Sequence, residues 1–388
     1  MNIKTTLKTS VAAAALFAVA VPVAEAGTVS NGNGNSVTVS GQVSKAFLYF
    51  DDGKSTDTAV VDNDNSGSRF RILGSGKVNE AVSVGTALEV EFQDNASNNF
   101  VLDDSSAAGN GANSNAAADT FGQGNFNQRR MEAYISHKQF GKLSIGQGPT
   151  ASDGTAETML GGSYMAAGGG VFFVIGSANI RTANQADNTF GTTTWGSKFT
   201  NLDGASRSDR IRYDSPTFAG FQVSGSALSD GRADVAVRYK GKFDSVTVKG
   251  AASYLSQSAA STTVDDQWVV SAAAKHDSGL TIRGHYGAAD KSNSNANTKE
   301  TKAWNVSAGY DASLTSMGTT AFAVGYTVTE DAAANGDEGT MIDFGVVQHL
   351  SDAGTELYLG VQMMEFDDAS AVNYEDATAV FAGTRIKF

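Results

Sequence analysis

Hydrophobic and polar residues alternate along short segments of the chain from residue 37 onward. In residues 280–288, Leu280 and Ile282 fall on one face, whereas Arg283 and His285 fall on the other. Successive side chains of a β-strand point to opposite faces, so a period of two predicts strands with one apolar and one polar face. Helical periodicity is hard to find, and the pattern therefore predicts an all-β protein.

About sixteen segments of roughly ten residues carry this alternation, which is typical of an outer-membrane barrel. They lie at 37–50, 67–78, 81–93, 128–140, 142–148, 207–218, 221–229, 234–243, 246–256, 267–276, 280–290, 302–312, 319–329, 339–350, 355–366 and 376–388. Very short turns and long polar loops take turns between them, which indicates a transmembrane antiparallel β-barrel. Closure also removes the strand edges that an open sheet of this size would expose.

Alternation alone does not separate a membrane barrel from a soluble sandwich, in which the apolar face meets a second sheet. Aromatic residues favour the barrel, because they recur near strand ends as an interfacial girdle requires. They are Tyr49, Phe50, Phe92, Tyr134, Tyr213, Phe218, Phe322 and Tyr326. We therefore predict one barrel over residues 27–388, with the last residue, Phe388, at its rim.

The longest unpatterned connection is the Gly-rich segment of residues 150–206. A structureless connection of this length inside a compact domain is expected only where the loop is functional. An apolar run from Val171 to Ile175 lies in its middle. This run needs dry contact, either against an inner wall or at a subunit interface.

Residues 1–26 are predicted to be a secretory signal peptide, with Lys4 and Lys8 before an apolar run and an A-x-A cleavage site at its end. Without this segment, the 28 basic and 41 acidic side chains become 26 and 40, a net charge of −14. Such acidity argues against a nucleic-acid partner. The chain has no Cys, which excludes disulfides and thiolate metal sites. No later apolar run reaches about 18 residues, so no membrane helix is predicted.

Four stretches and the terminal Phe388 resemble the general, non-specific porins of the Gram-negative outer membrane. The stretches are 37–43 (VTVSGQV), 68–75 (SRFRILGS), 140–147 (FGKLSIGQ) and 211–218 (IRYDSPTF). The resemblance implies a homotrimer of sixteen-stranded barrels, each with its own pore. It implies that the third external loop, residues 150–206, folds into the lumen and constricts it. Phe388 resembles the signal that the barrel-assembly machinery reads.

The resemblance further implies basic residues on the lumen wall opposite acidic residues on the constriction loop. Alternation places four arginines of the predicted strands 67–78 and 207–218 on the inward face. Of the adjacent residues Arg129 and Arg130, only one can point inward, and alternation does not decide which. The predicted basic residues are Arg69, Arg71, Arg130, Arg210 and Arg212. The predicted loop acids are Glu157 first, then Asp153, and also Asp187 and Asp203. Gln42 and Gln147 stand where many relatives carry a basic residue, which thins the basic wall.

Other chemistry finds little support in the sequence. Residues 62–67 (DNDNSG) resemble half of a Ca²⁺ loop, but Leu73 stands where that loop needs a bidentate Glu. A solvated external loop is the simpler interpretation, although Asp62 and Asp64 could bind Ca²⁺ and bridge lipopolysaccharide. The four His residues are scattered and no catalytic motif occurs, so we expect neither a cofactor nor enzymatic activity.

The predicted function is passive diffusion of small hydrophilic solutes and ions across the outer membrane. Opposed charges across a wet constriction would create a transverse field in which polar solutes orient. Net acidity and the two glutamines favour weak cation selectivity. The alternatives are a substrate-specific porin, marked by an aromatic slide, and a structural or adhesive barrel whose loops matter more than its pore.

Overall fold

The computed structural model describes residues 27–30, 34–101, 125–167, 172–183, 193–257, 264–291, 299–370 and 372–388. The predicted signal peptide, residues 1–26, lies outside them. Regular structure in the described residues is almost entirely β-strand. None of the helices in these ranges is long and apolar enough to cross a membrane.

The strands follow one another along the chain with few other elements between them. They are β1 (Gly27–Ser30), β2 (Ser36–Asp51), β3 (Thr56–Asp62), β4 (Arg69–Lys77), β5 (Val82–Gln93), β6 (Asn125–His137), β7 (Gly141–Pro149), β8 (Arg207–Asp214), β9 (Phe221–Leu228), β10 (Ala233–Phe243), β11 (Val246–Ser256), β12 (Val264–His276), β13 (Leu280–Lys291), β14 (Thr301–Thr315), β15 (Gly318–Glu330), β16 (Glu338–Leu350), β17 (Thr355–Asp367) and β18 (Ala377–Lys387). The helical turns are η1 (Asp64–Ser66), η2 (Ser97–Asn99), α1 (Phe172–Ile175), η4 (Trp195–Ser197) and η5 (Ser351–Ala353).

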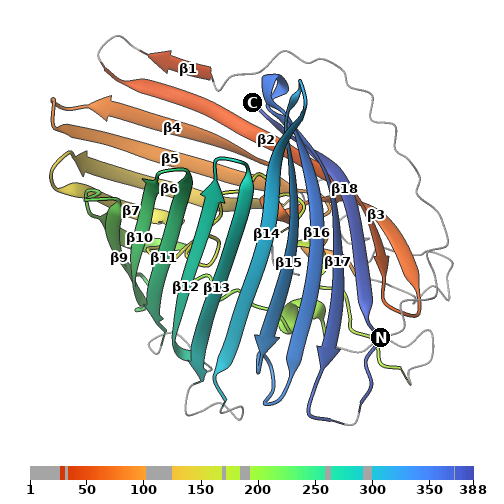
Figure 1. Ribbon diagram of the computed structural model, residues 1–388. Helices are drawn as coiled ribbons and strands as arrows, with labels where there is room; N and C mark the ends of the chain where they lie inside the picture. Colours follow the sequence, from red (N-terminus) through yellow and green to blue (C-terminus); the bar gives the residue numbers. More distant parts are fainter. Residues whose placement is uncertain are drawn as a thin grey trace.

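These strands form one closed antiparallel barrel (Figure 1). Each strand from β4 to β18 pairs with its neighbour in sequence, and β18 pairs back onto β2. β3 and β4 share one position beside β2, and β1 only prolongs the rim, so the wall has the predicted sixteen positions. The barrel closes at its last residue: Phe388 N–H donates to Gly41 O at 3.0 Å, and Gly41 N–H donates to Phe388 O at 2.7 Å.

Residues 51–66, which the alternation leaves as a connection between two predicted strands, are mostly strand and an inward turn. Lys45 of β2 pairs with Asp62 at the end of β3, and Gln42 of β2 pairs with Arg69 at the start of β4. Between these two pairs lie two residues of β2, 43 and 44, but six residues, 63–68, on the opposite side. The surplus forms the turn with η1, which leaves the wall toward the lumen.

Short hairpins on one side of the barrel have the backbone that tight turns require. Ala219 and Gly220, between β8 and β9, both adopt positive φ, at 49° and 86°. A two-residue turn with positive φ at both positions matches the right-handed twist of the strands that it joins. The short turns predicted from the sequence therefore join antiparallel neighbours directly.

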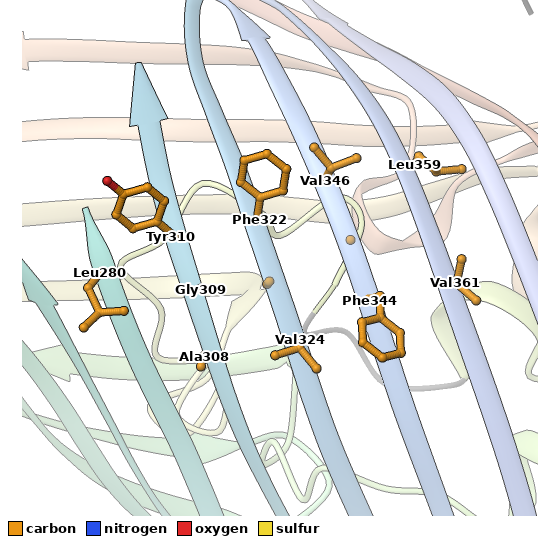
Figure 2. A pocket seen from close by; sticks show the side chains of 12 residues that line it. Leu280, Ala308, Gly309, Tyr310, Phe322, Val324, Phe344, Val346, Leu359 and Val361 are labelled. Atoms are coloured by element: carbon orange, nitrogen blue, oxygen red, sulfur yellow. The ribbon is translucent and has the colours of Figure 1, made fainter. Parts of the chain in front are cut away.

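The outer face of the barrel is apolar, as alternation predicts for a wall in contact with lipid. Exposed side chains on this face include Val39, Ile135, Ile145, Ile211, Val237, Ile282, Val306 and Leu359. Across β13–β17 the wall is hollowed into an apolar groove of about 620 Å³. Figure 2 shows its side chains, among them Tyr310, Phe322 and Phe344, standing on neighbouring strands. This groove lies outside the lumen and takes no part in the passage described below.

One predicted girdle residue is misplaced. Phe50 is fully buried and packs edge-on against Phe100, with ring centroids 5.9 Å apart, in an apolar cluster inside the barrel. The reason is parity: Tyr49 and Phe50 are adjacent on β2 and send their side chains to opposite faces. Leu48, two residues from Phe50, is buried in the same cluster.

Candidate pore constriction

Between β7 and β8, the described residues of the loop, 150–167, 172–183 and 193–206, lie along the inside of the barrel, where Figure 1 shows them in yellow and green. The loop is closed at its base by Thr150 N–H, which donates to Ser206 O at 2.9 Å. Its first limb contacts inward side chains of distant strands: Thr155 Oγ1 lies 2.7 Å from Ser253 Oγ on β11, and Gly162 N–H donates to Asp311 Oδ1 on β14 at 3.1 Å.

Two glycines on neighbouring strands leave room for the loop backbone to lie against the inner face of the wall. Gly345 of β16 pairs directly with Gly360 of β17. A Cβ on either glycine would lie 2.6 Å from backbone atoms of Ala166, closer than such atoms approach in real structures. Beside this seat, His349 Nε2 lies 3.0 Å from Gly162 O. The strand wall is therefore shaped to the loop backbone.

The apolar run in the middle of the loop finds the dry contact that its sequence requires. Val174 and Ile175 of α1 are buried in a cluster that includes Trp195 of the same loop and Phe366 of β17. Of the two predicted alternatives, the inner wall is confirmed for these two residues. The cluster fills the space between the loop and β2, β3 and β16–β18.

Ion pairs fix the distal half of the loop to the outer connections. Arg181 and Asp52 are both buried and form a salt bridge. Lys198 Nζ lies 3.0 Å from Asp337 Oδ2 and 4.4 Å from the centroid of the Phe366 ring. Burial of both partners makes such pairs costly to break, because the remaining charge would lose its compensation.

Three of the four predicted loop acids converge. Asp203 accepts hydrogen bonds from Ala156 N–H at 2.7 Å and from Gly154 N–H at 2.8 Å, which ties the second limb of the loop to the first. Asn201 donates to Glu157 at 3.4 Å. Asp153 and Glu157 line the same cavity as Asp203. The fourth predicted acid, Asp187, lies outside the described residues.

Burial and mutual repulsion favour the protonated forms of these acids. Burial raises the pKa of Asp203 to about 8, and the neighbouring Glu157 adds to the shift, although the two backbone N–H donors oppose it. Burial also raises the pKa of Glu157, with Asp153 adding to the effect. The loop therefore carries at least one carboxyl group, that of Asp203, whose charge changes near neutral pH.

The predicted basic residues of β4 face the lumen, but they are paired with wall acids. Arg71 Nε lies 2.8 Å from Glu89 Oε2. Arg69 Nη1 lies 3.6 Å from Glu89 Oε1, and Arg69 Nη2 lies 3.5 Å from Glu91 Oε2. Arg129 of β6 binds the same two acids, with Nε 2.8 Å from Glu89 Oε1 and Nη1 2.5 Å from Glu91 Oε2. Three guanidinium groups thus share two carboxylates, and one positive charge is left over on this part of the wall.

Both residues of the pair Arg129 and Arg130 face inward. Glu89 of β5 pairs with Arg130, whereas the next residue, Val90, pairs with Gln128, so Arg129 is the extra residue of a β-bulge. Arg130 forms a salt bridge with Glu132. The prediction that only one of them can point to the lumen is wrong, because it assumed an unbroken period of two.

The predicted residues of β8 hold the start of the loop. Arg210 is buried, forms a salt bridge with Glu132 and donates to Gly146 O at 2.8 Å. Arg212 donates to Thr150 O at 2.6 Å, and its Nη2 lies 2.7 Å from Asp214 Oδ1. These two arginines face inward as predicted, yet their donors are occupied by wall acids and loop carbonyls.

A cavity, called the passage below, remains between the loop and the inner wall at β4, β6, β8 and β12. It has a volume of about 440 Å³. Its charged lining consists of Arg69, Arg129, Arg207, Asp64, Asp153, Glu157 and Asp203. Arg207 was not predicted, because parity within β8 groups it with the outward Ile211. The residue lies at the first position of the strand, next to Ser206, whose positive φ of 53° turns the chain there.

The predicted Ca²⁺ ligands have other partners. Asp62 is buried, lies 2.9 Å from Lys45 Nζ and accepts Asp94 N–H at 2.9 Å. Asp64 accepts a hydrogen bond from Gln93, and burial raises its pKa to about 7. Among the residues that the structure describes, no three His, Asp or Glu side chains gather as metal ligands. The placement of these acids in an external loop is therefore wrong.

A closed barrel with an apolar outer wall and a charged lumen narrowed by an internal loop defines an outer-membrane pore protein. The sequence matches the profile of the Gram-negative porins over residues 9–369, and the chain belongs to this family. It is an integral protein of the outer membrane, and its family and fold support a passive channel. No curated protein sequence matches the chain.

Solved porin structures share the fold at low sequence identity. An anion-selective porin from Comamonas acidovorans is 17% identical, with 91% of this chain and 100% of that chain covered and a TM-score of 0.56. A loop L8 deletion mutant of OmpT from Vibrio cholerae is 15% identical, with 92% and 100% covered and a TM-score of 0.57. OmpF of Salmonella typhi, in complex with daunomycin, is 13% identical, with 93% and 100% covered and a TM-score of 0.54.

Proposed function

We propose that the protein is a passive, weakly cation-selective diffusion channel for small hydrophilic solutes and ions. The observation that carries this proposal is the charge of the passage lining. Four carboxyl groups, those of Asp64, Asp153, Glu157 and Asp203, face three guanidinium groups. Two of these guanidinium groups, Arg69 and Arg129, already share the wall acids Glu89 and Glu91. When all four carboxyl groups are ionised, above the raised pKa values of Asp64 and Asp203, negative charge is in excess.

A dehydrated ion is sensitive to the sign of this local charge, because low-dielectric walls focus the field along the passage. Cations are therefore concentrated at the constriction relative to anions. One structural neighbour is described as anion-selective. The fold therefore does not by itself require a cation preference, and the proposal rests on the lining residues of this chain.

The lining also supports a non-specific channel over a substrate-specific one. Tyr164 is the one aromatic residue among the described residues of the passage lining. An aromatic slide for a bound substrate would need several such rings in succession.

Planar bilayers provide the test. The purified protein should give steady open-channel currents that increase linearly with salt concentration, and the reversal potential in a KCl gradient should have the sign of a cation preference. A reversal potential of the opposite sign would overturn the selectivity. The absence of any steady conductance would favour a structural or adhesive barrel instead.

The proposed assembly is a homotrimer in the outer membrane. Its support is the family, together with the Vibrio cholerae OmpT structure that is described as a trimer form. Chemical cross-linking of the detergent-solubilised protein, read on gels with and without heating, should give a ladder that ends at three subunits. Lipopolysaccharide and the barrel-assembly machinery, the latter through Phe388, are further proposed partners.

A further inference from the structure

Two inward-facing residues of β10 hold the first limb of the constriction loop through its backbone. The Asp234 carboxylate accepts Ala151 N–H at 3.2 Å and Ser152 N–H at 2.8 Å. The Arg238 guanidinium donates through one nitrogen, Nη2, to Ala151 O at 2.8 Å and to Asp153 O at 2.7 Å. An acceptor and a donor of opposite charge thus bind successive peptide groups of the same short segment.

The strand geometry explains why these two residues work together. Residues four apart on a strand share a face and are separated by about 13 Å. Ala236 lies between Asp234 and Arg238 on the same face and is buried, so a small side chain leaves space for the loop backbone. Ser226, which pairs with Asp234 across β9 and β10, accepts Ala151 N–H at 2.7 Å.

Hydrogen bonds also connect the first limb of the loop, which follows β7, to the second limb, which precedes β8. Ser152 Oγ donates to Asp234 Oδ2 at 2.5 Å and accepts Ala205 N–H at 3.0 Å. Asp203, two residues before Ala205, binds the first limb through the backbone donors described above. The position of β10 therefore determines where Asp153 and Asp203 lie in the passage.

We propose that Asp234 and Arg238 are the positioning residues of the constriction, and that Arg238 acts through the geometry of its guanidinium group instead of through its charge. This inference rests on the proposed channel function. The two N–H groups of Arg238 Nη2 are fixed in the guanidinium plane, whereas the ammonium of a lysine rotates freely at the end of a flexible chain. Lysine keeps the charge of Arg238 and loses the rigid contact with two carbonyl groups.

The test compares Arg238→Lys with Arg238→Ala in planar bilayers, with Arg232→Lys as the matched control. Arg232 lies outside the passage lining, and its Nη2 is 2.7 Å from Asp230 in the connection before β10. We expect Arg238→Lys and Arg238→Ala to share the same increase in open-channel current noise and the same change in conductance, whereas Arg232→Lys behaves as the wild type. If Arg238→Lys keeps wild-type noise, conductance and reversal potential, the inference is overturned.

A second measurement does not depend on ion flow. The chain has no Cys, so Asp153→Cys introduces a single thiol into the passage. Its rate of modification by a charged thiol reagent should change when Arg238→Lys is added and should stay constant when Arg232→Lys is added. Equal rates in all three backgrounds would overturn the inference even if the proteins conduct.

The two proposals fail in distinguishable ways. If the wild type shows no steady conductance, the channel function fails, and the thiol measurement still tests the position of the loop. If the wild type conducts and the Arg238 variants match it, only the positioning role fails. Should Arg238→Lys fold poorly, Ser226→Ala removes a single acceptor and should produce a smaller change in noise of the same direction; an unchanged noise level there would count against the inference.

Discussion

Arg210 and Glu132 form a salt bridge in which both side chains are almost completely buried in the barrel wall. Arg130 reaches the other oxygen of the same carboxylate. Arg210 therefore contributes to the stability of the wall and of the loop base more than to the charge of the passage. The sequence pattern alone predicted Arg210 and Arg71 equally as basic residues of the lumen wall, but the side chain of Arg71 is 38% exposed.

Arg210→Gln should lower the stability of the barrel more than Arg71→Gln does. We expect a loss of about 2 kcal/mol for Arg210→Gln, below the roughly 3–5 kcal/mol of a lone buried pair, because Arg130 still faces Glu132. For the exposed Arg71 we expect under about 1 kcal/mol. Thermal unfolding, followed by gel mobility of unheated and heated samples, measures both. Equal losses in the two variants would contradict this assignment.

Cation selectivity should increase with pH. An acid with a raised pKa is neutral below that value and ionised above it. The pKa of Asp64 is raised to about 7 and that of Asp203 to about 8, in both cases chiefly by burial. As the pH rises through this window, the passage gains negative charge opposite Arg69, Arg129 and Arg207.

Reversal potentials in a fixed KCl gradient on both sides of this window measure the effect. Asp203→Asn removes one of the two titrating charges and should reduce the pH dependence, and adding Asp64→Asn should remove most of the remainder. A wild-type reversal potential that is constant across the window would show that these carboxyl groups do not control ion selectivity.

The Gly345–Gly360 pair should be intolerant of even one added methyl group. Gly345→Ala would place a Cβ 2.6 Å from backbone atoms of Ala166, so the loop has to move or the wall has to deform. Overpacking of this kind costs roughly 1–3 kcal/mol. We expect a changed single-channel conductance together with lower thermal stability.

Gly250→Ala is the matched control for this glycine prediction, because the nearest atom to its added Cβ is Ser271 O at 3.6 Å. This variant should conduct as the wild type does. If Gly345→Ala and Gly250→Ala have the same conductance and the same stability, the position of the loop does not depend on the Gly345–Gly360 pair.

Alternation predicted which face of a strand each residue occupies, and it did so well where the pairing is regular. The predicted segment 246–256 coincides with β11. The pattern fails where the period of two is broken. A bulge turns both Arg129 and Arg130 inward, and the turn at η1 splits one wall position into β3 and β4.

The partners of the site residues could not be predicted, because alternation contains no information on register across strands. Arg210 and Glu132 are 78 residues apart in sequence, and their contact depends on the pairing of β6, β7 and β8. The loop acids were found by their residue type. Their convergence depends on backbone hydrogen bonds, such as those from Gly154 and Ala156 to Asp203, which no sequence pattern specifies.

Arg207 should have the largest effect on ion selectivity among the arginines of β8. Its guanidinium group lines the passage beside the loop acids, and none of the hydrogen bonds or ion pairs between described residues involves it. Arg212, in contrast, binds Thr150 O and Asp214. Arg207→Glu changes the sign of an accessible charge and should shift the reversal potential strongly toward cations, with little loss of thermal stability.

Arg212→Glu provides the comparison for Arg207→Glu, since it makes the same change of charge five residues further along the same strand. It would place a carboxylate against a loop carbonyl and the Asp214 carboxylate, so we expect lower thermal stability and noisier channels. Bilayer recordings and thermal unfolding of both variants decide the matter. If both reversals shift the reversal potential equally and leave stability unchanged, Arg212 is a free pore charge, and the distinction between lining and anchoring arginines is wrong.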